Sequence, residues 1–391
     1  MPNQPKGAIV GLGVTPMGKI YGRRSVDFAA EAIALALDDA GLEKSDLDGL
    51  LINANISGDM DPRSQMVLGF ENLTLINVMS AFGSTAGSVM QYACMAIEQG
   101  LANVVALVYA DAPLTATRSA GQSYAGPHRF PLGGMVGLRA AYGNFGANPE
   151  YAMAARRHMH LYGTTSDHFG TIAVGQRAWA GMSPWAQMRS PISLEDHHNS
   201  RFIADPLRLL DCCLVSNGAV CVIVTSAAKA RDLRQPPIYV LGYAQCAPGD
   251  NQRTDRHPAV ETGAKRSGEI AFRMAGITVN DVDICQLYDC YTYTVLVTLE
   301  DYGFCEKGEG GPFVADGKLG PGGSLPTNTG GGQLSGYYMW AFTPLSEAVV
   351  QARGQGGERQ VAKNDVVLVS ANGGILNFHA TIILSKHASS S

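Results

Sequence analysis

The sequence predicts an α/β protein built from two similar halves, stacked as five alternating layers of helix and sheet. Strand patterns alternate with helix patterns along the chain, and the strand patterns are apolar throughout, as a sheet covered on both faces requires. A segment of the second half also repeats one of the first. A duplicated βαβ-type unit predicts αβαβα packing, with a ligand site where the two halves meet.

Composition restricts the class of protein. The 391 residues are 46% hydrophobic and 16% charged, which is typical of a compact enzyme with a large core. The net charge of −5 and the lack of a Lys/Arg-rich run argue against nucleic acid or an anionic membrane as partner. The chain opens without a secretory leader pattern and has no apolar run of ~18 residues, so we expect a cytoplasmic protein. The eight cysteines form no CxxC pair and indicate reduced core thiols, with no metal site.

In the first half, apolar runs alternate with segments of helical periodicity. We expect strands at 8–16, 73–78 and 103–112, a turn leading into a strand at 40–55, and helices at 25–40 and within 80–100. Residues 113–210 break this pattern, with Gly, Pro, Met and His scattered around two expected helices near 149–161 and 165–182. A long insertion of this kind usually covers a site or an interface.

The sheet pattern returns after the insertion. Residues 214–226 contain a further apolar strand, and Pro236 and Pro237 then fit a linker better than a helix or a central strand. We therefore divide the chain into an N-terminal half, residues 1–232 with the insertion, and a C-terminal half, residues 233–391.

The two halves share a repeated segment. Residues Ala40 to Ile52 read AGLEKSDLDGLLI and Ala275 to Leu287 read AGITVNDVDICQL, so that Ala, Gly, Asp and Asp recur at an offset of 235 residues. Each copy follows a helix pattern and leads into a strand pattern. A looser match relates residues 96–110 to residues 348–371. This repetition is the basis for predicting a duplicated fold.

A glycine-rich stretch in the last quarter is the strongest candidate for a functional loop. Residues Asn328 to Trp340 read NTGGGQLSGYYMW. Three consecutive glycines suit a backbone that turns tightly or approaches another group closely. Tyr337 and Tyr338 follow directly, so we interpret the stretch as an active-site loop with Tyr338 as a catalytic residue; a surface turn with two rim aromatics is the alternative.

Three long segments resemble a known family. The segments 209–226 (LLDCCLVSNGAVCVIVTS), 283–310 (DICQLYDCYTYTVLVTLEDYGFCEKGEG) and 328–361 occur in the order found in the thiolase superfamily, in its sterol carrier protein-x thiolase branch. This resemblance covers most of the chain. It implies the thiolase fold, a duplicated αβαβα five-layered architecture with a long loop insertion in the N-terminal half.

The catalytic positions of thiolases are not retained here. Where the family has its nucleophilic cysteine, this chain has Gly83 or Ser80, depending on the alignment of the SAFGSTA loop. The Gly-His-Pro motif is replaced by Tyr337-Tyr338-Met339, and Gly374 lies nearest to the lost second cysteine. Without a thiolate, acyl-enzyme chemistry has no obvious carrier.

One branch is similar in these departures as well. The lipid-transfer-protein-type aldolases, which shorten steroid side chains in bacteria, lack the thiolase cysteines and use tyrosines, which the resemblance places at Tyr288 and Tyr338. It implies a lyase that cuts a β-hydroxyacyl-CoA into a ketone and a short acyl-CoA, with no cofactor apart from the coenzyme A of the substrate. It further implies a homodimer that binds a small partner with an OB-fold and often a zinc ribbon, forming a heterotetramer.

A retro-aldol cut needs a base, an acid and support for the thioester enolate. Tyrosines can move the protons only if their surroundings tune the phenol, whose ordinary pKa is near ~10. Backbone N–H groups near Gly83, or near Gly373 and Gly374, would support the enolate. His379 is a weaker candidate for this support, with a hydrogen-bonded core histidine as its alternative reading.

Further residues and other functions stay open. Asp289 either orients the site or caps a helix, and the adjacent His197 and His198 lack a third metal ligand at helical spacing. A thiolase-like acyltransferase would need Ser80 or Ser84 as nucleophile. A non-catalytic lipid-binding or scaffold subunit would tolerate phenylalanine in place of both tyrosines.

Overall fold

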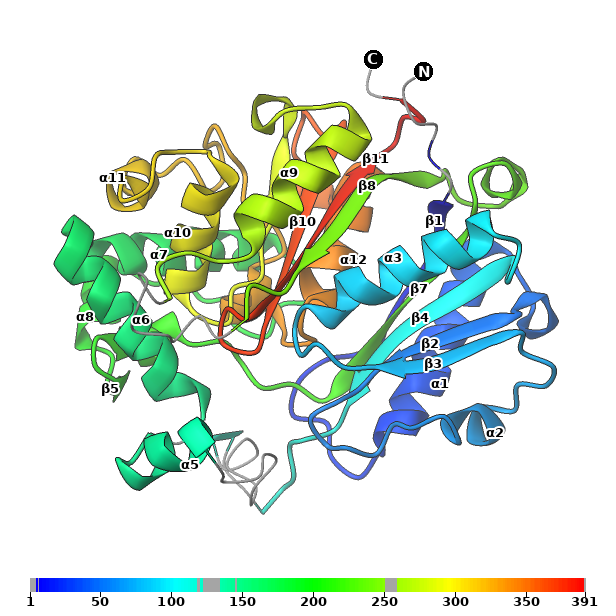
Figure 1. Ribbon diagram of the computed structural model, residues 1–391, viewed down its shortest axis with the longest axis horizontal. Coiled ribbons are helices and arrows are strands. Elements are labelled where there is room, and N and C mark those ends of the chain that lie inside the picture. Colours follow the sequence, from blue (N-terminus) through cyan, green and yellow to red (C-terminus); the bar gives the residue numbers. More distant parts are fainter. Residues whose placement is uncertain are drawn as a thin grey trace.

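The computed structural model describes residues 5, 7–117, 120–121, 134–144, 146–249 and 259–389. A mixed sheet runs through the molecule with helices on both faces (Figure 1). The strands are β1 (Gly7–Val14), β2 (Gly49–Asn53), β3 (Leu75–Met79), β4 (Val104–Asp111), β5 (Phe202–Ala204), β6 (Leu207–Arg208), β7 (Gly218–Ser226), β8 (Ile238–Cys246), β9 (Ile284–Gln286), β10 (Val366–Gly373) and β11 (Phe378–Ser385). The α-helices are α1 (Ser25–Ala40), α2 (Ser64–Leu68), α3 (Thr85–Glu98), α5 (Gly134–Ala141), α6 (Ala147–Tyr162), α7 (Ser166–Met182), α8 (Leu194–Asn199), α9 (Ala264–Ala275), α10 (Thr292–Tyr302), α11 (Gly310–Ala315) and α12 (Phe342–Ala352). The shorter turns are η1 (Lys44–Asp46), η2 (Leu209–Asp211), η3 (Lys229–Asp232), η4 (Val279–Asp281), η5 (Gly332–Gly336, a π-helical turn) and η6 (Gly357–Arg359).

The strand order shows how the two halves join. It is β3-β2-β4-β7-β1-β8-β11-β10-β9, so the first five strands come from the N-terminal half and the last four from the C-terminal half. The halves meet at the antiparallel pairing of β1 with β8, where Ala8 lies opposite Tyr239 and Ile9 opposite Ile238. β4 and β10 are buried along their whole length. This agrees with their uninterrupted apolar sequence and with helices on both sides.

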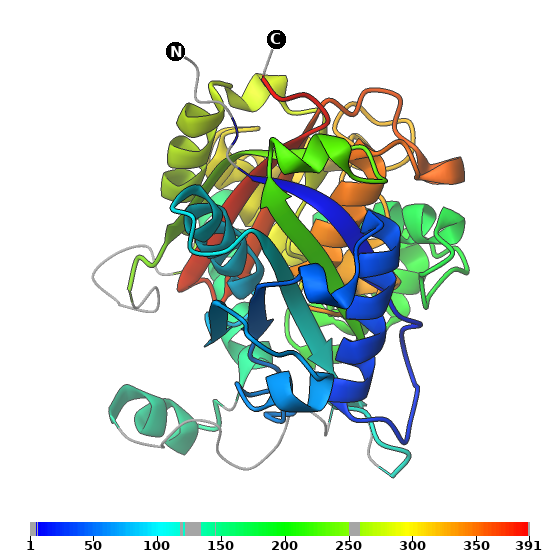
Figure 2. The same ribbon diagram turned by 90° about the vertical axis from the view of Figure 1, so that its right-hand side faces the viewer.

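The helices form the expected layers. α1 packs on β1, β7 and β4, and α9 packs on β8 and β11. Figure 2 shows α1 (blue) and α9 (yellow-green) on opposite sides of the molecule. α3 and α12 contact strands of both halves and so form a central helical layer. The predicted five-layered α/β architecture is thus confirmed.

The same close contact between helix and strand occurs in both halves. A Cβ atom at Gly11 in β1 would lie 2.3 Å from the carbonyl oxygen of Ala36 in α1. A Cβ atom at Gly242 in β8 would lie 2.2 Å from the carbonyl oxygen of Ala271 in α9. Only glycine leaves room for these helix backbones. The repeated contact is a structural sign of duplication, and the division of the chain into residues 1–232 and 233–391 stays a proposal.

An aspartate from the repeated segment also has the same role twice. A carboxylate oxygen of Asp48 accepts a hydrogen bond from the N–H of Val104, which begins β4, at 2.8 Å. A carboxylate oxygen of Asp283 accepts one from the N–H of Val366, which begins β10, at 2.9 Å. These two carboxylates therefore fix corresponding strands at equivalent points. The sequence repeat is a repeat of structure.

The insertion contains the two helices that the sequence predicts, α6 and α7. It adds α5, α8 and the β5–β6 hairpin, for which the sequence carries no clear periodic pattern. All eight cysteines are free thiols. No helix within the described residues is both long and apolar enough to cross a bilayer.

Candidate active site

The two tyrosines that the sequence analysis singles out lie together in the interior of the molecule. Tyr288 follows β9 and precedes α10, and Tyr338 follows the π-helical turn η5 and precedes α12. Their hydroxyl oxygens are 3.1 Å apart and share a hydrogen bond. Both side chains are largely buried, with relative exposures of 5% for Tyr288 and 8% for Tyr338. The structure thus brings these predicted residues into one small polar site within an apolar core.

The backbone around Tyr288 is held from two sides. The N–H of Leu287 donates to the side-chain oxygen of Asn328 at 2.7 Å, and the hydroxyl of Thr294 donates to the carbonyl of Tyr288 at 3.0 Å. Asn328 begins the glycine-rich loop and has a positive φ of 53°. A non-glycine residue seldom adopts this conformation unless its surroundings enforce it. Tyr288 is therefore fixed in part by the loop that carries Tyr338.

Tyr338 is held by the other half of the chain. Its N–H donates to the hydroxyl of Ser216 at 2.9 Å, and Ser216 also accepts from the side-chain amide of Gln187 at 2.6 Å. Trp340, with a φ of 47°, stacks on Tyr109 of β4 with ring centroids 5.0 Å apart. These contacts come from the N-terminal half and its insertion. The site therefore depends on the packing of the two halves against each other.

The glycine-rich loop turns around the side chain of Asp289. Both carboxylate oxygens lie within 3.0 Å of the N–H nitrogen of Gln333, and one accepts from the N–H of Leu334 at 3.3 Å. A Cβ atom at Gly332, which has a φ of 57°, would lie only 2.1 Å from this carboxylate. Burial raises the pKa of Asp289 to about 7, although the N–H donors act in the opposite direction. Asp289 thus caps the π-helical turn, whereas Thr294 caps the start of α10.

Gly83 and Gly373 lie beside the tyrosine pair. A Cβ atom at Gly83 would be 2.4 Å from the ring of Tyr288 and 2.2 Å from the carbonyl oxygen of Asn372. A Cβ atom at Gly373 would be 2.9 Å from the backbone nitrogen of Gly83. Gly374, with a φ of 59°, lies against the ring of Phe378. Helix α3 begins two residues after Gly83, so the positive end of its dipole is directed at this part of the site.

His379 belongs to a different group of polar side chains. Its Nε2 atom lies 3.0 Å from the hydroxyl of Tyr302 and 3.0 Å from that of Ser370. Burial lowers the pKa of His379 to about 3, so the ring is neutral. Among the described residues, neither tyrosine of the site is a hydrogen-bond partner of His379. The Nε2 atom thus has the contacts expected for a core histidine, whereas the buried Nδ1 atom has no hydrogen-bond partner among the described residues.

The surroundings of the tyrosine pair oppose negative charge. Burial raises the pKa of Tyr288 well above its ordinary value, and the nearby thiols of Cys290 and Cys213 add to this, while the hydroxyl of Tyr338 opposes it. Burial also raises the pKa of Cys290 to about 12 and that of Cys213 well above its usual range. The phenol and both thiols therefore keep their protons at neutral pH. These cysteines lack the thiolate character of a nucleophile.

The two serines weighed as alternative nucleophiles lie on the loop before α3. Ser80 is exposed and Ser84 is buried. A serine nucleophile needs a base within hydrogen-bonding reach. Among the hydrogen bonds of the described residues, none joins the hydroxyl of Ser80 or Ser84 to a histidine or a carboxylate. The serine-dependent alternative gains no support from this geometry.

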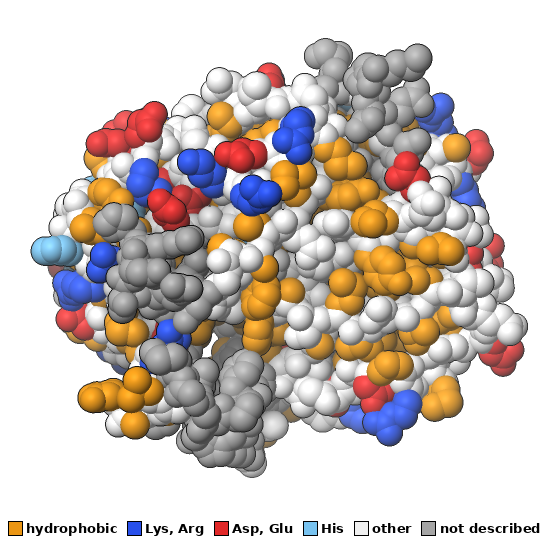
Figure 3. All heavy atoms as spheres, in the orientation of Figure 1, with side chains coloured by type: hydrophobic (Ala, Val, Ile, Leu, Met, Phe, Trp, Pro, Cys, Tyr) orange, Lys and Arg blue, Asp and Glu red, His pale blue; other side chains and the backbone are white. Residues whose placement is uncertain are grey.

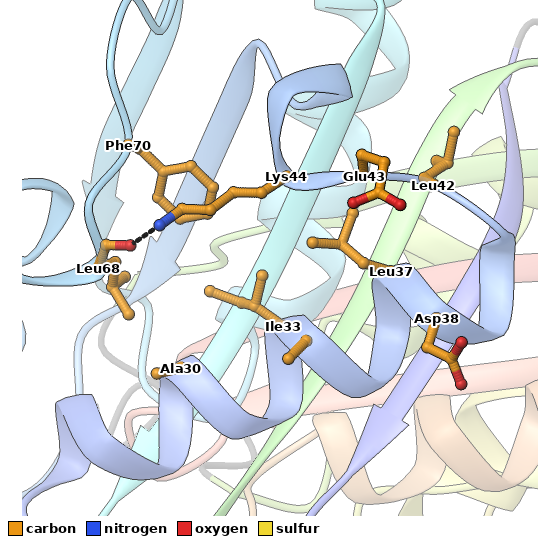
Figure 4. Close-up of a pocket in the computed structure, with 10 residues that line it drawn as sticks. Ala30, Ile33, Leu37, Asp38, Leu42, Glu43, Lys44, Leu68 and Phe70 are labelled. Atoms are coloured by element: carbon orange, nitrogen blue, oxygen red, sulfur yellow. Dashed lines mark hydrogen bonds between the residues drawn. The ribbon is translucent and has the colours of Figure 1, made fainter.

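Two surface hollows lie apart from the tyrosine pair. One, of about 420 Å³, is formed by α1 and the segments around Lys44 and Phe70 (Figure 4). There Lys44 donates to the carbonyl of Leu68 and its ammonium group lies 5.0 Å from the centre of the Phe70 ring. The other, of about 480 Å³, lies between α6 and the β5–β6 hairpin. Neither hollow is lined by Tyr288 or Tyr338.

The adjacent histidines contact two different carboxylates. His197 lies 2.8 Å from a carboxylate oxygen of Asp211, and His198 lies 2.8 Å from one of Asp167. In the residues that the structure describes, no three His, Cys, Asp or Glu side chains are grouped as metal ligands.

Sequence reasoning missed the residues that fix the site from a distance. Ser216 and Asn328 were not singled out and the role of Asp289 was left open, although each binds backbone groups that lie far away in the sequence. An aspartate next to a candidate catalytic tyrosine, followed later by three consecutive glycines, is the one signal that could have suggested such a cap. The N–H groups that it would bind could not be identified without the fold.

Comparison with known proteins identifies the family. Residues 249–386 match the family model described as thiolase C-terminal domain-like. A 17-hydroxy-3-oxo-4-pregnene-20-carboxyl-CoA lyase of Mycobacterium tuberculosis is 38% identical over 378 residues, which cover 94% of this chain and 96% of that protein. A steroid side-chain-cleaving aldolase of Thermomonospora curvata is also 38% identical, over 94% of this chain and 95% of that protein.

Solved structures agree with this assignment. The structure of an Ltp2-ChsH2(DUF35) aldolase is similar with a TM-score of 0.86 and 34% identity, covering 98% of this chain and 99% of that one. A monomeric SCP2-thiolase-like protein of Mycobacterium smegmatis has a TM-score of 0.76 at 19% identity, covering 99% of this chain and 78% of that one, and so shares the fold. The resemblance predicted from the sequence is confirmed. The chain belongs to the thiolase superfamily, in the branch of the steroid side-chain-cleaving aldolases.

Proposed function

We propose that the protein is a lyase that cleaves a β-hydroxyacyl-CoA, with a steroid-like acyl group, into a ketone and a short acyl-CoA by a retro-aldol reaction. The observation that carries this proposal is the hydrogen bond of 3.1 Å between the hydroxyls of Tyr288 and Tyr338 in a buried site. The names of two relatives, a carboxyl-CoA lyase and a side-chain-cleaving aldolase, support the same reaction class and a steroid substrate.

The reaction requires proton movement but no covalent intermediate. The bond between the α- and β-carbons breaks while the β-hydroxyl loses its proton and becomes the ketone oxygen. The electron pair passes to the thioester as an enolate, and a proton on the α-carbon completes the acyl-CoA. One proton leaves oxygen and one reaches carbon, so neither a redox partner nor a metal is needed for the balance.

The tyrosine pair suits this balance when it acts as a relay. Because burial keeps Tyr288 protonated, a free phenolate base would be costly. Instead, one phenol takes the proton of the substrate hydroxyl while it passes its own proton to the other phenol through their shared hydrogen bond. In the same step the second phenol gives its own proton to the α-carbon, so that neither phenol carries two protons at any point. The pair stays neutral overall and returns to its starting state.

Backbone groups near the pair would stabilise the enolate. We assign this role to Gly83, and to Gly373 and Gly374 on the facing loop. Gly83 lies against the Tyr288 ring, and α3 begins just after it, so its dipole favours a developing negative charge there. His379 is a weaker candidate, since its Nε2 atom already has two partners.

Two observations support proposals about partners. The similar Ltp2-ChsH2(DUF35) aldolase is named for two components, so we propose a small partner protein of the DUF35 type here, with an OB-fold and a zinc ribbon, in a heterotetramer.

We further propose a homodimer formed by β3 and α3. β3 is an edge strand, apolar side chains gather on the face of the molecule that contains α3 (Figure 3), and Met95 of α3 is exposed. A cytoplasmic location stays a prediction.

A direct experiment tests the reaction. The purified chain, with and without a co-purified small subunit, is incubated with a tertiary β-hydroxyacyl-CoA, and mass spectrometry measures the ketone and the short acyl-CoA. We expect equal amounts of both products and an intact protein mass that stays unmodified during turnover. A mass increase corresponding to a trapped acyl group would favour the serine acyltransferase instead. Absence of cleavage with the partner present would favour a scaffold subunit.

A further inference from the structure

We propose that Asp289 is a positioning residue, whose ionised carboxylate holds the glycine-rich loop so that Tyr338 meets Tyr288. This inference rests on the proposed function, because it assigns a role within the same site. Asp289 directly follows one tyrosine in the chain and binds the loop that leads to the other. Asp289 therefore links the two tyrosines through the backbone of the loop, in addition to the hydrogen bond between their hydroxyls.

The geometry of this connection is specific. Both oxygens of Asp289 lie within 3.0 Å of the Gln333 nitrogen, and one lies 3.3 Å from the Leu334 nitrogen. The carboxylate is completely buried, and a side chain at Gly332 would collide with it. Tyr338 follows within the same short loop. A change in the cap therefore reaches the phenol through one rigid turn.

The opposite side of the turn is held from α7. The guanidinium of Arg177 donates to the hydroxyl of Ser335 at 2.8 Å. The side-chain oxygen of Gln176 is only 3.0 Å from the position of a Cβ atom at Gly332. The turn is thus clamped between the insertion and Asp289. If the contacts on one side of the turn were lost, those on the other side alone would fix the conformation of the loop.

The cap needs the charged form of the carboxylate. Each carboxylate oxygen of Asp289 accepts a hydrogen bond from a backbone N–H group. A proton on either oxygen would point at the hydrogen of that group and would disrupt the cap. The titratable groups around Asp289 are Tyr288, Cys213 and Cys290, all protonated at neutral pH, and Arg177 is the charged group on the facing helix. With its pKa near 7, Asp289 loses the cap as the pH falls through that value. Activity should therefore rise with pH across this range.

The test is Asp289→Asn, which keeps the shape but places an amide against the N–H donors. Asp283→Asn is the matched control, because Asp283 is also buried and caps the start of β10 in the same way. In cleavage assays of the whole assembly between about pH 6 and pH 8, we expect Asp289→Asn to lower kcat about 100-fold at pH 8, with KM nearly unchanged and without the acid limb of the parent. Asp283→Asn should lower thermal stability but retain the kcat and pH profile of the parent.

Hydrogen–deuterium exchange gives a readout that does not depend on activity. The peptide covering residues 332–338 should exchange about tenfold faster or more in Asp289→Asn, and at the parental rate in Asp283→Asn. An active Asp289→Asn variant with the parental kcat and acid limb would overturn the positioning role but leave the proposed reaction intact. Unchanged exchange in the loop would overturn it even if the parent had no aldolase activity. Failure of the parent alone to cleave any β-hydroxyacyl-CoA would contradict the proposed function.

Discussion

At the scale of single residues, the site depends on glycines as much as on the two tyrosines and the aspartate. Gly83 leaves space for the Tyr288 ring, and Gly332 leaves space for the Asp289 carboxylate. Tyr288 and Tyr338 then share a hydrogen bond, and burial raises the pKa of Tyr288 well above its ordinary value. A buried hydrogen-bonded pair of this kind moves a proton with little charge separation.

The space at Gly83 makes a direct prediction. We expect Gly83→Ala to displace the Tyr288 ring, lowering kcat at least tenfold and the free energy of unfolding by about 1–3 kcal/mol. Steady-state kinetics and urea denaturation measure the two effects. Gly181→Ala in α7 is the control, since a Cβ atom there would lie 3.5 Å from its nearest neighbour. A fully active Gly83→Ala protein would show that this position does not support the phenol.

The identity of the two tyrosines could be predicted from the sequence only through the family resemblance. Fifty residues separate Tyr288 from Tyr338, and no local pattern predicts that their hydroxyls meet. The role of Asp289 was left open because its partners, the N–H groups of Gln333 and Leu334, become known only with the fold. Periodicity describes which face of an element is buried; it does not describe contacts between distant loops.

At the scale of elements, helix α10 links the site to the insertion. It begins just after Tyr288 and is buried over its whole length. Glu300 in α10 lies 3.0 Å from Nε2 of His158 in α6, and 3.1 Å from the ammonium of Lys307. Burial alone would raise the pKa of Glu300, but His158 and Lys307 hold it below its usual value. This network ties the insertion to the helix that positions one of the phenols.

Breaking the network should be costly. We expect Glu300→Gln to lower the free energy of unfolding by about 3 kcal/mol, because it removes the buried negative charge that binds the ammonium of Lys307 and the ring of His158. Denaturant unfolding monitored by circular dichroism measures this change. Glu31→Gln, which removes a half-exposed surface pair with Arg23, should leave the midpoint nearly unchanged. Equal midpoints for the two variants would contradict a structural role for the buried network.

The sequence predicted the elements of the repeated framework better than those of the insertion. α1 has the expected bounds, and the segments around 40–52 and 275–287 form matching turns and strands. In these segments, burial against a sheet imposes a regular apolar period. The π-helical turn η5 and helices α5 and α8 carry no such period. Their conformations depend on tertiary contacts such as the cap at Asp289.

At the scale of the whole molecule, the site is a product of two halves that pack on a shared helical layer. Ser216 of the N-terminal half binds the backbone of Tyr338 in the C-terminal half. α3 belongs to that layer, contacts the edge strand β3 and also bears exposed Met95. The proposed homodimer would cover this edge. Dimerisation and the geometry of the site are then linked through α3.

The proposed dimer is tested at that face. We expect Met95→Glu to shift the protein from dimer to monomer, because it places a charge in an apolar contact. Analytical ultracentrifugation at several concentrations measures the mass. Leu35→Glu on α1, where the residue is similarly exposed but lies on an outer layer, should leave the dimer intact. A parent protein that is monomeric at every concentration would disprove this interface.

The central claim is that the two phenols act as one unit that breaks a carbon–carbon bond without acylating the protein. A double-mutant cycle of Tyr288→Phe and Tyr338→Phe, with kcat measured by ketone formation, tests it most directly. We expect each single variant to lose about 10³-fold in kcat and the double variant to lose hardly more, because either change interrupts the same relay. Losses that multiply in the double variant, or a double variant as fast as the parent, would contradict the account.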